Sequence, residues 1–229
     1  MTDEEHYLLA EWEMFRRDPS RRAATLNVTA GERVERVLDV GCGAGQELLP
    51  LITERRAVGV GIDVSAVAGE MARRHFPDSA FFFVRGAAER LPFRPECFDV
   101  VICRVALPLF DQQASLDEMA RVLRPGGLLL LKIHSPWLGA RYLWRGIREG
   151  RAGAGSYSLR VLRASVRYAL TGETTYHGGI PVMLCTTRGK LRRELNRRGL
   201  ATAFEMPDST RVAPSFAIRK LPLAAQRGE

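Results

Sequence analysis

Short apolar runs alternate with stretches in which apolar residues recur every three or four positions, from residue 34 to residue 134. The continuous runs are rich in valine, isoleucine and leucine, which is typical of strands buried on both faces of a parallel sheet. The three- and four-residue spacing is typical of helices with one buried face. The pattern predicts strands at residues 34–40, 57–63, 80–85, 98–103 and 127–133, and helices at 46–55, 66–75 and 116–123. This order predicts a sheet that is covered by helices on both faces.

Proline, glycine and hydroxyl residues indicate where elements begin and end. The run Arg124-Pro125-Gly126-Gly127 is expected to end the third helix and turn the chain into the next strand. Nearer the C-terminus, Thr187 is the expected N-cap of a helix that Gly199 ends. Residues 201–205 and 216–219 then complete a predicted set of seven strands.

Two segments lie outside this alternation. Residues 136–185 contain two helical patterns, 137–148 and 156–170, joined by a linker rich in glycine and alanine. The first 33 residues are expected to be helical, with Tyr7, Leu8, Trp12 and Phe15 on one apolar face. The organisation that follows is one domain over residues 1–229, with an N-terminal helical extension at 1–33 and a helical insertion at 136–185.

The net charge of +8 is concentrated in one part of the chain. Residues 1–135 hold 17 Lys and Arg against 20 Asp and Glu, whereas residues 136–200 hold 13 against 3. Within the insertion, arginines recur at helical spacing as Arg141, Arg145 and Arg148, and again as Arg160, Arg163 and Arg167. The basic insertion has three possible interpretations: a solvated basic face, a lid over an anionic or amphiphilic acceptor, and a contact surface for a membrane or a nucleic acid.

Composition narrows the class of protein. With 46% hydrophobic and 26% charged residues the chain can bury a core, and it has no apolar run of about 18 residues that would cross a bilayer. The acidic start of the sequence is unlike a signal peptide, so we expect a cytoplasmic protein. The four cysteines lack the spacing of a zinc site or a disulfide framework, and we expect no metal.

A glycine-rich loop follows the first predicted strand, with the sequence Leu-Asp-Val-Gly-Cys-Gly-Ala-Gly over residues 38–45. Such loops let the backbone approach a ligand more closely than a Cβ would permit. A dinucleotide fingerprint would require glycine at position 46, where the chain has Gln46, and no Lys or Arg occurs at residues 37–54 to bind a polyphosphate. Asp39 would instead place a carboxylate beside a cationic amine.

The second predicted strand ends at Asp63, eighteen residues beyond Gly45. In parallel sheets of this kind, an acidic residue at that strand end accepts hydrogen bonds from ribose hydroxyls. The loop and Asp63 together favour one ligand, an adenosyl group that carries an amino acid.

With the motifs Phe98-Asp99-Val100-Val101 and Leu123-Arg124-Pro125-Gly126-Gly127, the chain resembles the class I S-adenosylmethionine-dependent methyltransferases, in particular the group that acts on small molecules. The resemblance covers residues 34–134 and, more weakly, 187–220. It implies a Rossmann-like, doubly wound α/β fold with a seven-stranded, mostly parallel sheet, an antiparallel last strand and helices on both faces. The strand order it implies is 3-2-1-4-5-7-6, and the cofactor it implies is S-adenosyl-L-methionine.

The resemblance also implies a set of cofactor-binding residues, in which the glycine loop surrounds the methionine moiety and Asp63 binds the ribose. The set is Asp39, Gly41, Cys42, Gly43, Gly45, Gln46, Asp63, Val64, Gly86, Ala87, Ala88, Glu89, Cys103 and Arg104. Two positions depart from the family pattern. Ala87 stands where the family often has an aspartate that contacts the adenine amino group, and Pro108 stands where it often has a histidine.

Methyl transfer from a sulfonium is an in-line displacement, so positioning and exclusion of water supply most of the rate acceleration. A general base is needed only for a poorly acidic acceptor. No catalytic residue is assigned from the sequence, and the residues expected nearest the acceptor are His134, Trp137, Tyr142, Tyr176 and His177.

The function that we expect is methyl transfer to a small anionic or amphiphilic molecule. Alternatives are an RNA methyltransferase and a protein that binds S-adenosylmethionine without catalysis. Nucleic acid is the less favoured partner, because the chain lacks both the Asn/Asp-Pro-Pro-aromatic run of amino-group base methylation and the Pro-Cys nucleophile of cytosine-carbon methylation. Peripheral membrane contact stays an alternative for the basic insertion.

Overall fold

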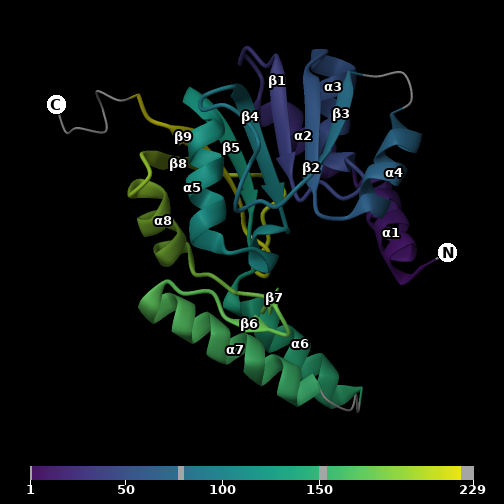
Figure 1. Cartoon of the computed structure of the whole chain (residues 1–229). Helices are drawn as coiled ribbons and strands as arrows, with labels where there is room; N and C mark the ends of the chain where they lie inside the picture. The colour runs from purple at the N-terminus through teal and green to yellow at the C-terminus, as the bar shows by residue number, and fades with distance from the viewer. Residues whose placement is uncertain (1, 77–79, 150–153, 223–229) are drawn as a thin grey trace.

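The computed structural model describes residues 2–76, 80–149 and 154–222. Within them, a sheet of seven strands has the order β3-β2-β1-β4-β5-β9-β8 (Figure 1). The strands are β1 (Arg36–Val40), β2 (Val58–Asp63), β3 (Phe81–Arg85), β4 (Phe98–Arg104), β5 (Leu123–Lys132), β8 (Leu200–Glu205) and β9 (Ser215–Lys220). The first five pair in parallel, and β9 is antiparallel to both β5 and β8. The predicted fold class and strand order are confirmed.

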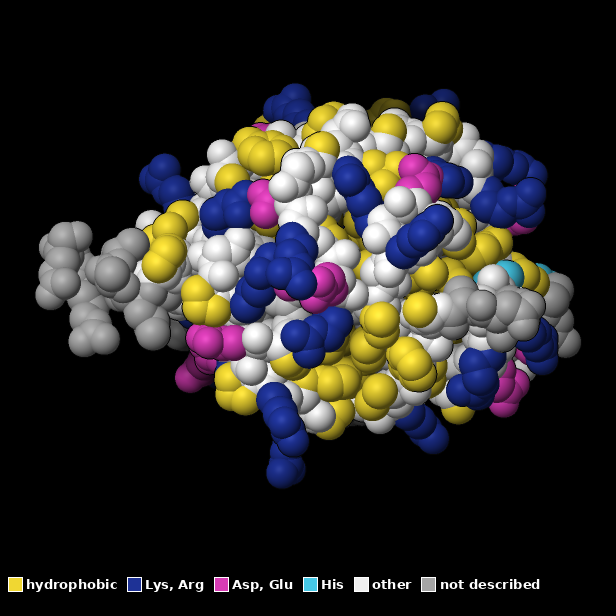
Figure 2. All heavy atoms as spheres, turned by 90° about the horizontal axis from the view of Figure 1, so that it is seen from above, with side chains coloured by type: hydrophobic (Ala, Val, Ile, Leu, Met, Phe, Trp, Pro, Cys, Tyr) yellow, Lys and Arg dark blue, Asp and Glu magenta, His cyan; other side chains and the backbone are white. Residues whose placement is uncertain are grey.

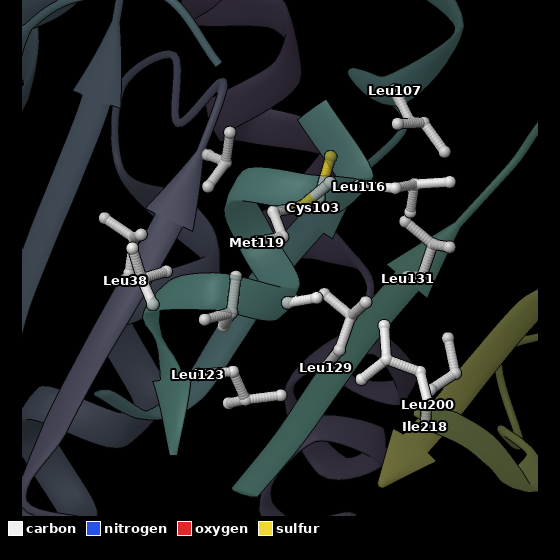
Figure 3. Packing of buried hydrophobic residues seen from close by; sticks show 14 of the residues in the cluster. Leu38, Cys103, Leu107, Leu116, Met119, Leu123, Leu129, Leu131, Leu200 and Ile218 are labelled. Carbon is white, nitrogen blue, oxygen red and sulfur yellow. The ribbon is translucent and has the colours of Figure 1, made fainter. Parts of the chain in front are cut away.

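The central strands are buried on both faces because each faces a different group of helices. Val37, Val100 and Leu128 point to one side and pack with the helices α2 (Pro19–Val28) and α3 (Leu49–Arg55). Residues one position further along point to the opposite side and pack with α5 (Gln112–Val122) and α8 (Arg188–Asn196). Figure 3 shows this second cluster, in which side chains of the sheet meet Leu116 and Met119 of α5. The alternation explains why the strands read as continuous apolar runs.

Most predicted helices begin and end close to the expected residues, and two differ. The segment predicted as one helix starts as a 3-10 turn, η1 (Gln46–Leu48), and becomes α-helical at α3, with Pro50 in the first turn, where its missing N–H is tolerated. Helix α5 begins four residues earlier than the predicted start at 116. It does so because the Asp111 carboxylate accepts hydrogen bonds from the backbone N–H groups of Gln113 and Ala114.

The expected turn at Arg124-Pro125-Gly126-Gly127 lies within β5 instead of before it. Pairing with β4 shifts register between Phe98↔Leu123 and Val100↔Leu128, so extra residues bulge out of β5. Gly126 takes a positive φ of 77° there, which glycine allows without strain. The motif therefore forms an irregularity in a strand that continues on both sides of it.

The N-terminal residues form α1 (Asp3–Arg17) and α2, as expected, and α1 packs on α4 (Ala66–His75). The ring of Trp12 stacks on that of His75, with centroids 3.6 Å apart. Leu8 is buried against Ala68 and Met71 of α4. These contacts hold α1 close to the glycine loop.

The helical patterns of the insertion form α6 (Pro136–Arg148) and α7 (Ala154–Thr171), which lie together beyond one end of the sheet (Figure 1). A short hairpin that the sequence did not predict follows them, with β6 (Tyr176–His177) paired to β7 (Ile180–Pro181). The backbone N–H of Leu184 then donates to the carbonyl of Pro108, in the 3-10 turn η2 (Leu107–Leu109), at 3.0 Å. The insertion thus lies at the end of the sheet where β1, β2 and β4 finish.

Among the described residues, no helix has both the length and the apolar character needed to cross a bilayer. The same residues contain no group of three His, Cys, Asp or Glu side chains arranged to hold a metal ion.

Candidate functional site

A cavity of about 460 Å³ opens where the parallel strands β1, β2 and β4 end. Its walls come from the glycine loop, the end of β2, the segments after β3 and β4, helix α1 and the β6–β7 hairpin. Ligands of open α/β sheets bind at this edge because the loops that follow the strands meet there. The volume is in the range of small-molecule sites.

The glycine loop forms the floor of this cavity. Gly41, Gly43 and Gly45 all have positive φ, of 72°, 52° and 83°. The loop is tied to β2, since the backbone N–H of Gly41 donates to the carbonyl of Ile62 at 2.8 Å. A Cβ at position 41 would lie 2.5 Å from the Cβ of Ala106, so that position requires glycine for space as well as for conformation.

Asp63 stands at the end of β2, next to the loop. Its Oδ2 accepts a hydrogen bond from the backbone N–H of Gly43, and its Oδ1 accepts one from the N–H of Ser65, both at 3.0 Å. An ionised carboxylate offers about four acceptor positions, so two of them stay available for the hydroxyl groups of a ligand. Asp63 therefore links the loop to β2 and still presents acceptors to the cavity.

The wall after β3 is formed by Gly86, Ala88 and Glu89. Glu89 Oε1 accepts from the backbone N–H of Asp111 at 2.9 Å, which joins this segment to the start of α5. Ala87, the departure from the family pattern, is exposed and is not among the described lining residues.

Arg104, at the end of β4, lines the cavity, but its guanidinium is held by buried carboxylates. It pairs with Asp208 and lies 3.5 Å from Glu47, which also pairs with Arg21. The next residue, Val105, has a φ of 73°, a strained conformation for a β-branched side chain, and it lines the cavity too. The ion pairs therefore fix the backbone where β4 turns into the site.

Most of the expected cofactor-binding residues meet at this cavity. Its walls include Gly41, Cys42, Gly43, Gln46, Asp63, Val64, Gly86, Ala88, Glu89 and Arg104. In the described part of the chain, the lining does not include Asp39, Gly45, Ala87 or Cys103.

Asp39 and Cys103 lie beneath the site instead of on its surface. Burial, with the negative charges of Glu47 and Asp63, raises the pKa of Asp39 well above its usual value. Its Oδ2 has no hydrogen-bond partner among the described residues. Cys103 is fully buried in the cluster against α5, and burial raises the pKa of its thiol. The two side chains point to opposite faces of the sheet, and both faces are buried under helices.

The side chains expected nearest the acceptor are not in the described lining of the cavity. Trp137 is stacked under the guanidinium of Arg211, and the Tyr176 hydroxyl donates to Asp111 at 3.4 Å. His177 Nε2 lies 3.1 Å from a guanidinium nitrogen of Arg160. Tyr142 is exposed on α6.

His134 is half-buried at the end of β5, where burial lowers its pKa. Its carbonyl accepts from the N–H of Thr186 at 2.8 Å. The lining found within the described residues contains none of the five expected acceptor-side residues.

Sequence reasoning missed the residues that close the cavity from distant parts of the chain. The N-terminal helices contribute Glu4, Tyr7, Leu8, Glu11 and Arg21, and the hairpin contributes Ile180 and Pro181. Burial raises the pKa of Glu11, partly offset by the nearby charge of Arg21. The apolar face that includes Tyr7 and Leu8 predicted that α1 packs on another element, but no local signal indicated which element that is.

Comparisons with known proteins agree with this geometry. Residues 38–131 match the family model described as a methyltransferase domain. An uncharacterised methyltransferase of Synechocystis is 36% identical over 136 residues, which cover 51% of this chain and 63% of that protein. A demethylmenaquinone methyltransferase of Beutenbergia cavernae is 39% identical over 119 residues, covering 51% of this chain and 48% of that one. The chain thus spans about half the length of the curated relatives it matches.

The fold extends beyond the matched segment. A putative methyltransferase solved in complex with the Haloferax volcanii Trm112 methyltransferase activator superposes with a TM-score of 0.65 at 16% identity, over 97% of this chain and 99% of the solved one. The residues that match the family model include the glycine loop, Asp63, the whole of β2, β3 and β4, and most of β1 and β5. Residues 38–131 therefore match a methyltransferase domain, and the chain as a whole shares the fold of a solved putative methyltransferase.

Proposed function

We propose that this chain transfers the methyl group of S-adenosylmethionine to a small amphiphilic acceptor. The observation that carries the proposal is the composition of one cavity. Its floor is the glycine loop beside Asp63, and its rim is formed by the apolar side chains of Leu109, Phe110, Ile180 and Pro181. A polar cofactor end and an apolar entrance suit an acceptor that is mainly apolar.

The residues present fit the cofactor. Gly41 and Gly43 give the loop the positive φ with which its backbone lines the cavity beside the place for the methionine moiety. Asp63 has free acceptor positions for the ribose, and Gly86 with Ala88 offers a wall for the adenine. When bound, the cofactor supplies a methyl group on a sulfonium, which needs no covalent help from the protein. The chain contributes binding, alignment of the acceptor and exclusion of water.

The acceptor end is built by elements outside the family match. Tyr7 and Glu11 of α1 face this region from one side, and Ile180 of the hairpin from the other. No histidine is among the lining residues that the structure describes, so we propose that histidine base catalysis plays no part. The relative named for demethylmenaquinone, a small molecule, supports this acceptor class over nucleic acid.

The test begins with calorimetric titration of S-adenosylmethionine and of its demethylated product into the purified chain. We expect micromolar binding that Asp63→Ala abolishes. Asp117→Ala is the matched control. The Asp117 carboxylate is exposed on α5 and is not among the described lining residues of the cavity. Failure of the unchanged chain to bind either ligand would overturn the proposed cofactor site.

Label transfer then tests the reaction. We expect label from methyl-labelled S-adenosylmethionine to enter apolar acceptors that carry a hydroxyl or phenol, and not RNA. Binding without transfer to any acceptor would support the non-catalytic alternative. Transfer to RNA alone would contradict the small-molecule assignment.

A further inference from the structure

Helix α7 exposes an apolar stripe. Its inner face is buried through Val161, Ala164 and Tyr168. On another face Leu159, Leu162, Val166 and Leu170 recur at three- and four-residue spacing and are all exposed, Leu162 at 59% and Leu170 at 81%. The helix is therefore apolar both where it packs and where it meets solvent, which its packing on this chain does not explain.

Helix α6 extends the same kind of surface. Trp144 and Ile147 are 62% and 71% exposed, and Trp137, Tyr142 and Leu143 are exposed as well. Between the two helices runs a groove of about 630 Å³ with an almost wholly apolar lining, which includes Leu143, Leu159, Leu162 and Val166. The groove shares no described lining residue with the cofactor cavity, so the methyl-transfer site does not account for it.

The charge beside this apolar surface is mostly positive. Residues 136–173 contain seven arginines and two acidic residues, Glu149 and Glu173, which pair with Arg145 and Arg167. Arg160, Arg163 and Arg167 follow each other along α7 next to the apolar stripe, and all three are exposed. The end of the molecule seen in Figure 2, away from α6 and α7, instead shows Lys and Arg mixed with Asp, Glu and hydrophobic side chains. The excess of positive charge is thus a property of the helical pair.

We propose that the α6–α7 face docks on the surface of an anionic lipid bilayer. The exposed leucines and tryptophans would enter the boundary between headgroups and acyl chains, while the arginines bind the lipid phosphates. Tryptophan and tyrosine at the edge of such a face are typical of interfacial helices. The charge selects this occupant over a second copy of the chain, which would bring the six exposed arginines of its own α6 and α7 against the same surface.

Docking also has a consequence for orientation. Helices α6 and α7 lie beyond the end of the sheet where the cofactor cavity opens (Figure 1), and Ile180 and Pro181 of the hairpin after α7 form part of that cavity. A chain bound through these helices would hold its active-site entrance near the bilayer. The docking surface itself rests on exposure and charge, and it does not depend on the proposed methyl transfer.

Flotation of the full chain with vesicles tests the proposal. We expect the chain to float with vesicles of phosphatidylcholine and phosphatidylglycerol and to remain unbound with vesicles of phosphatidylcholine alone. Salt should release the chain from the anionic vesicles. The double change Arg160→Gln and Arg163→Gln should weaken partitioning roughly fivefold for each arginine removed. The matched control is Arg192→Gln with Arg193→Gln, two exposed arginines of α8, which should partition like the unchanged chain.

The apolar half of the surface has its own pair of variants. Leu162→Gln should reduce partitioning, whereas Met14→Gln, at an exposed apolar position of α1, should not. Two of the three tryptophans lie on α6, and the third, Trp12, is stacked on His75. In the Trp12→Phe variant, only the two tryptophans of α6 contribute fluorescence. Vesicles with brominated acyl chains should therefore quench most of the tryptophan fluorescence of this variant.

Several outcomes would overturn the proposal. They are the absence of flotation, equal flotation with neutral vesicles, and binding that the α8 control weakens as much as the α7 variant. Dimerisation that Leu162→Gln abolishes, without vesicle binding, would assign the face to a second copy. RNA binding lost in the Arg160 and Arg163 variant, without vesicle binding, would assign it to nucleic acid. Calorimetric binding of S-adenosylmethionine should be unchanged in the arginine variants of α7 and α8 and in Leu162→Gln, which separates this test from that of the proposed function.

Discussion

The guanidinium of Arg104 and the carboxylate of Asp208 form an ion pair beneath the cofactor cavity, with the Arg104 side chain fully buried. The pair joins the end of β4 to the segment between β8 and β9, more than a hundred positions along the chain. Lys132, at the end of β5, lies 3.0 Å from the same carboxylate. Asp208 therefore compensates two cations behind the turn that carries Val105 into the site.

Asp208→Asn should destabilise the protein by about 3–5 kcal/mol, because it leaves a buried guanidinium without its main counter-charge. The free energy of unfolding from urea denaturation measures this. Asp117→Asn is the matched change, since Asp117 also pairs with an arginine, Arg198, at 2.7 Å but is 64% exposed. We expect it to cost less than about 1 kcal/mol. Equal losses of unfolding free energy in the two variants would show that the buried ion pair stabilises the protein no more than the exposed one.

Lys132 should make stability rise with pH above about 8. Burial, with the positive charges of Arg104 and Arg21, lowers the pKa of Lys132 to about 8, despite its contact with Asp208. Between that value and the pKa of about 10.4 in the unfolded chain, the unfolded state binds more protons, so the folded state gains as pH rises.

The comparison is between the unchanged chain and Lys132→Met at pH 7.5 and pH 9.5. The unchanged chain should gain about 1–2 kcal/mol relative to the variant, given that a full pKa unit corresponds to about 1.4 kcal/mol. Other groups titrate alike in both proteins and cancel in the difference. A difference that stays constant with pH would contradict the lowered pKa.

Gly41→Ala should remove cofactor binding and destabilise the fold. The added Cβ would meet Ala106 at 2.5 Å and Phe110 at 2.8 Å, and φ is already 72°. Overpacking of this kind costs about 1–3 kcal/mol in addition to the backbone strain. Gly31→Ala separates the two effects, because Gly31 has a φ of 79° but no atom within 4 Å of the added Cβ. That variant should lose about 1–2 kcal/mol from backbone strain alone and bind the cofactor normally in calorimetry.

His134→Ala and His177→Ala should leave turnover within about twofold of the unchanged chain, because neither side chain lines the cavity as described. Glu11→Gln is the contrasting change, since Glu11 lines the cavity and burial raises its pKa. We expect at least a tenfold loss in kcat/KM there, which corresponds to about 1.4 kcal/mol of transition-state stabilisation. Steady-state rates with the acceptor found by label transfer provide the measurement, and a tenfold loss in either histidine variant would contradict this prediction.

The sequence by itself determined the sheet and the cofactor half of the site. Strands β1 to β5 read as apolar runs because both faces of a parallel sheet are buried, and the pattern is local. The positions of Gly41 and Asp63 follow from the same reading, because a loop that ends one strand and an acid that ends its neighbour must meet at one edge. The prediction of a turn before β5 was wrong, because these residues form a bulge within the strand. A bulge and a turn use the same proline and glycine residues.

Only the tertiary structure decided which side chains complete the cavity. Tyr7, Glu11 and Ile180 reach it through the packing of α1 and of the hairpin, and contacts between such distant segments leave no periodic signal in the chain. The same holds for Arg104, which lines the cavity but whose ion pair with Asp208 only the fold decides. The local sequence pattern predicts burial and backbone conformation, because both depend on neighbouring residues in the chain. The partner of a charged or aromatic side chain depends on where the rest of the chain lies in space.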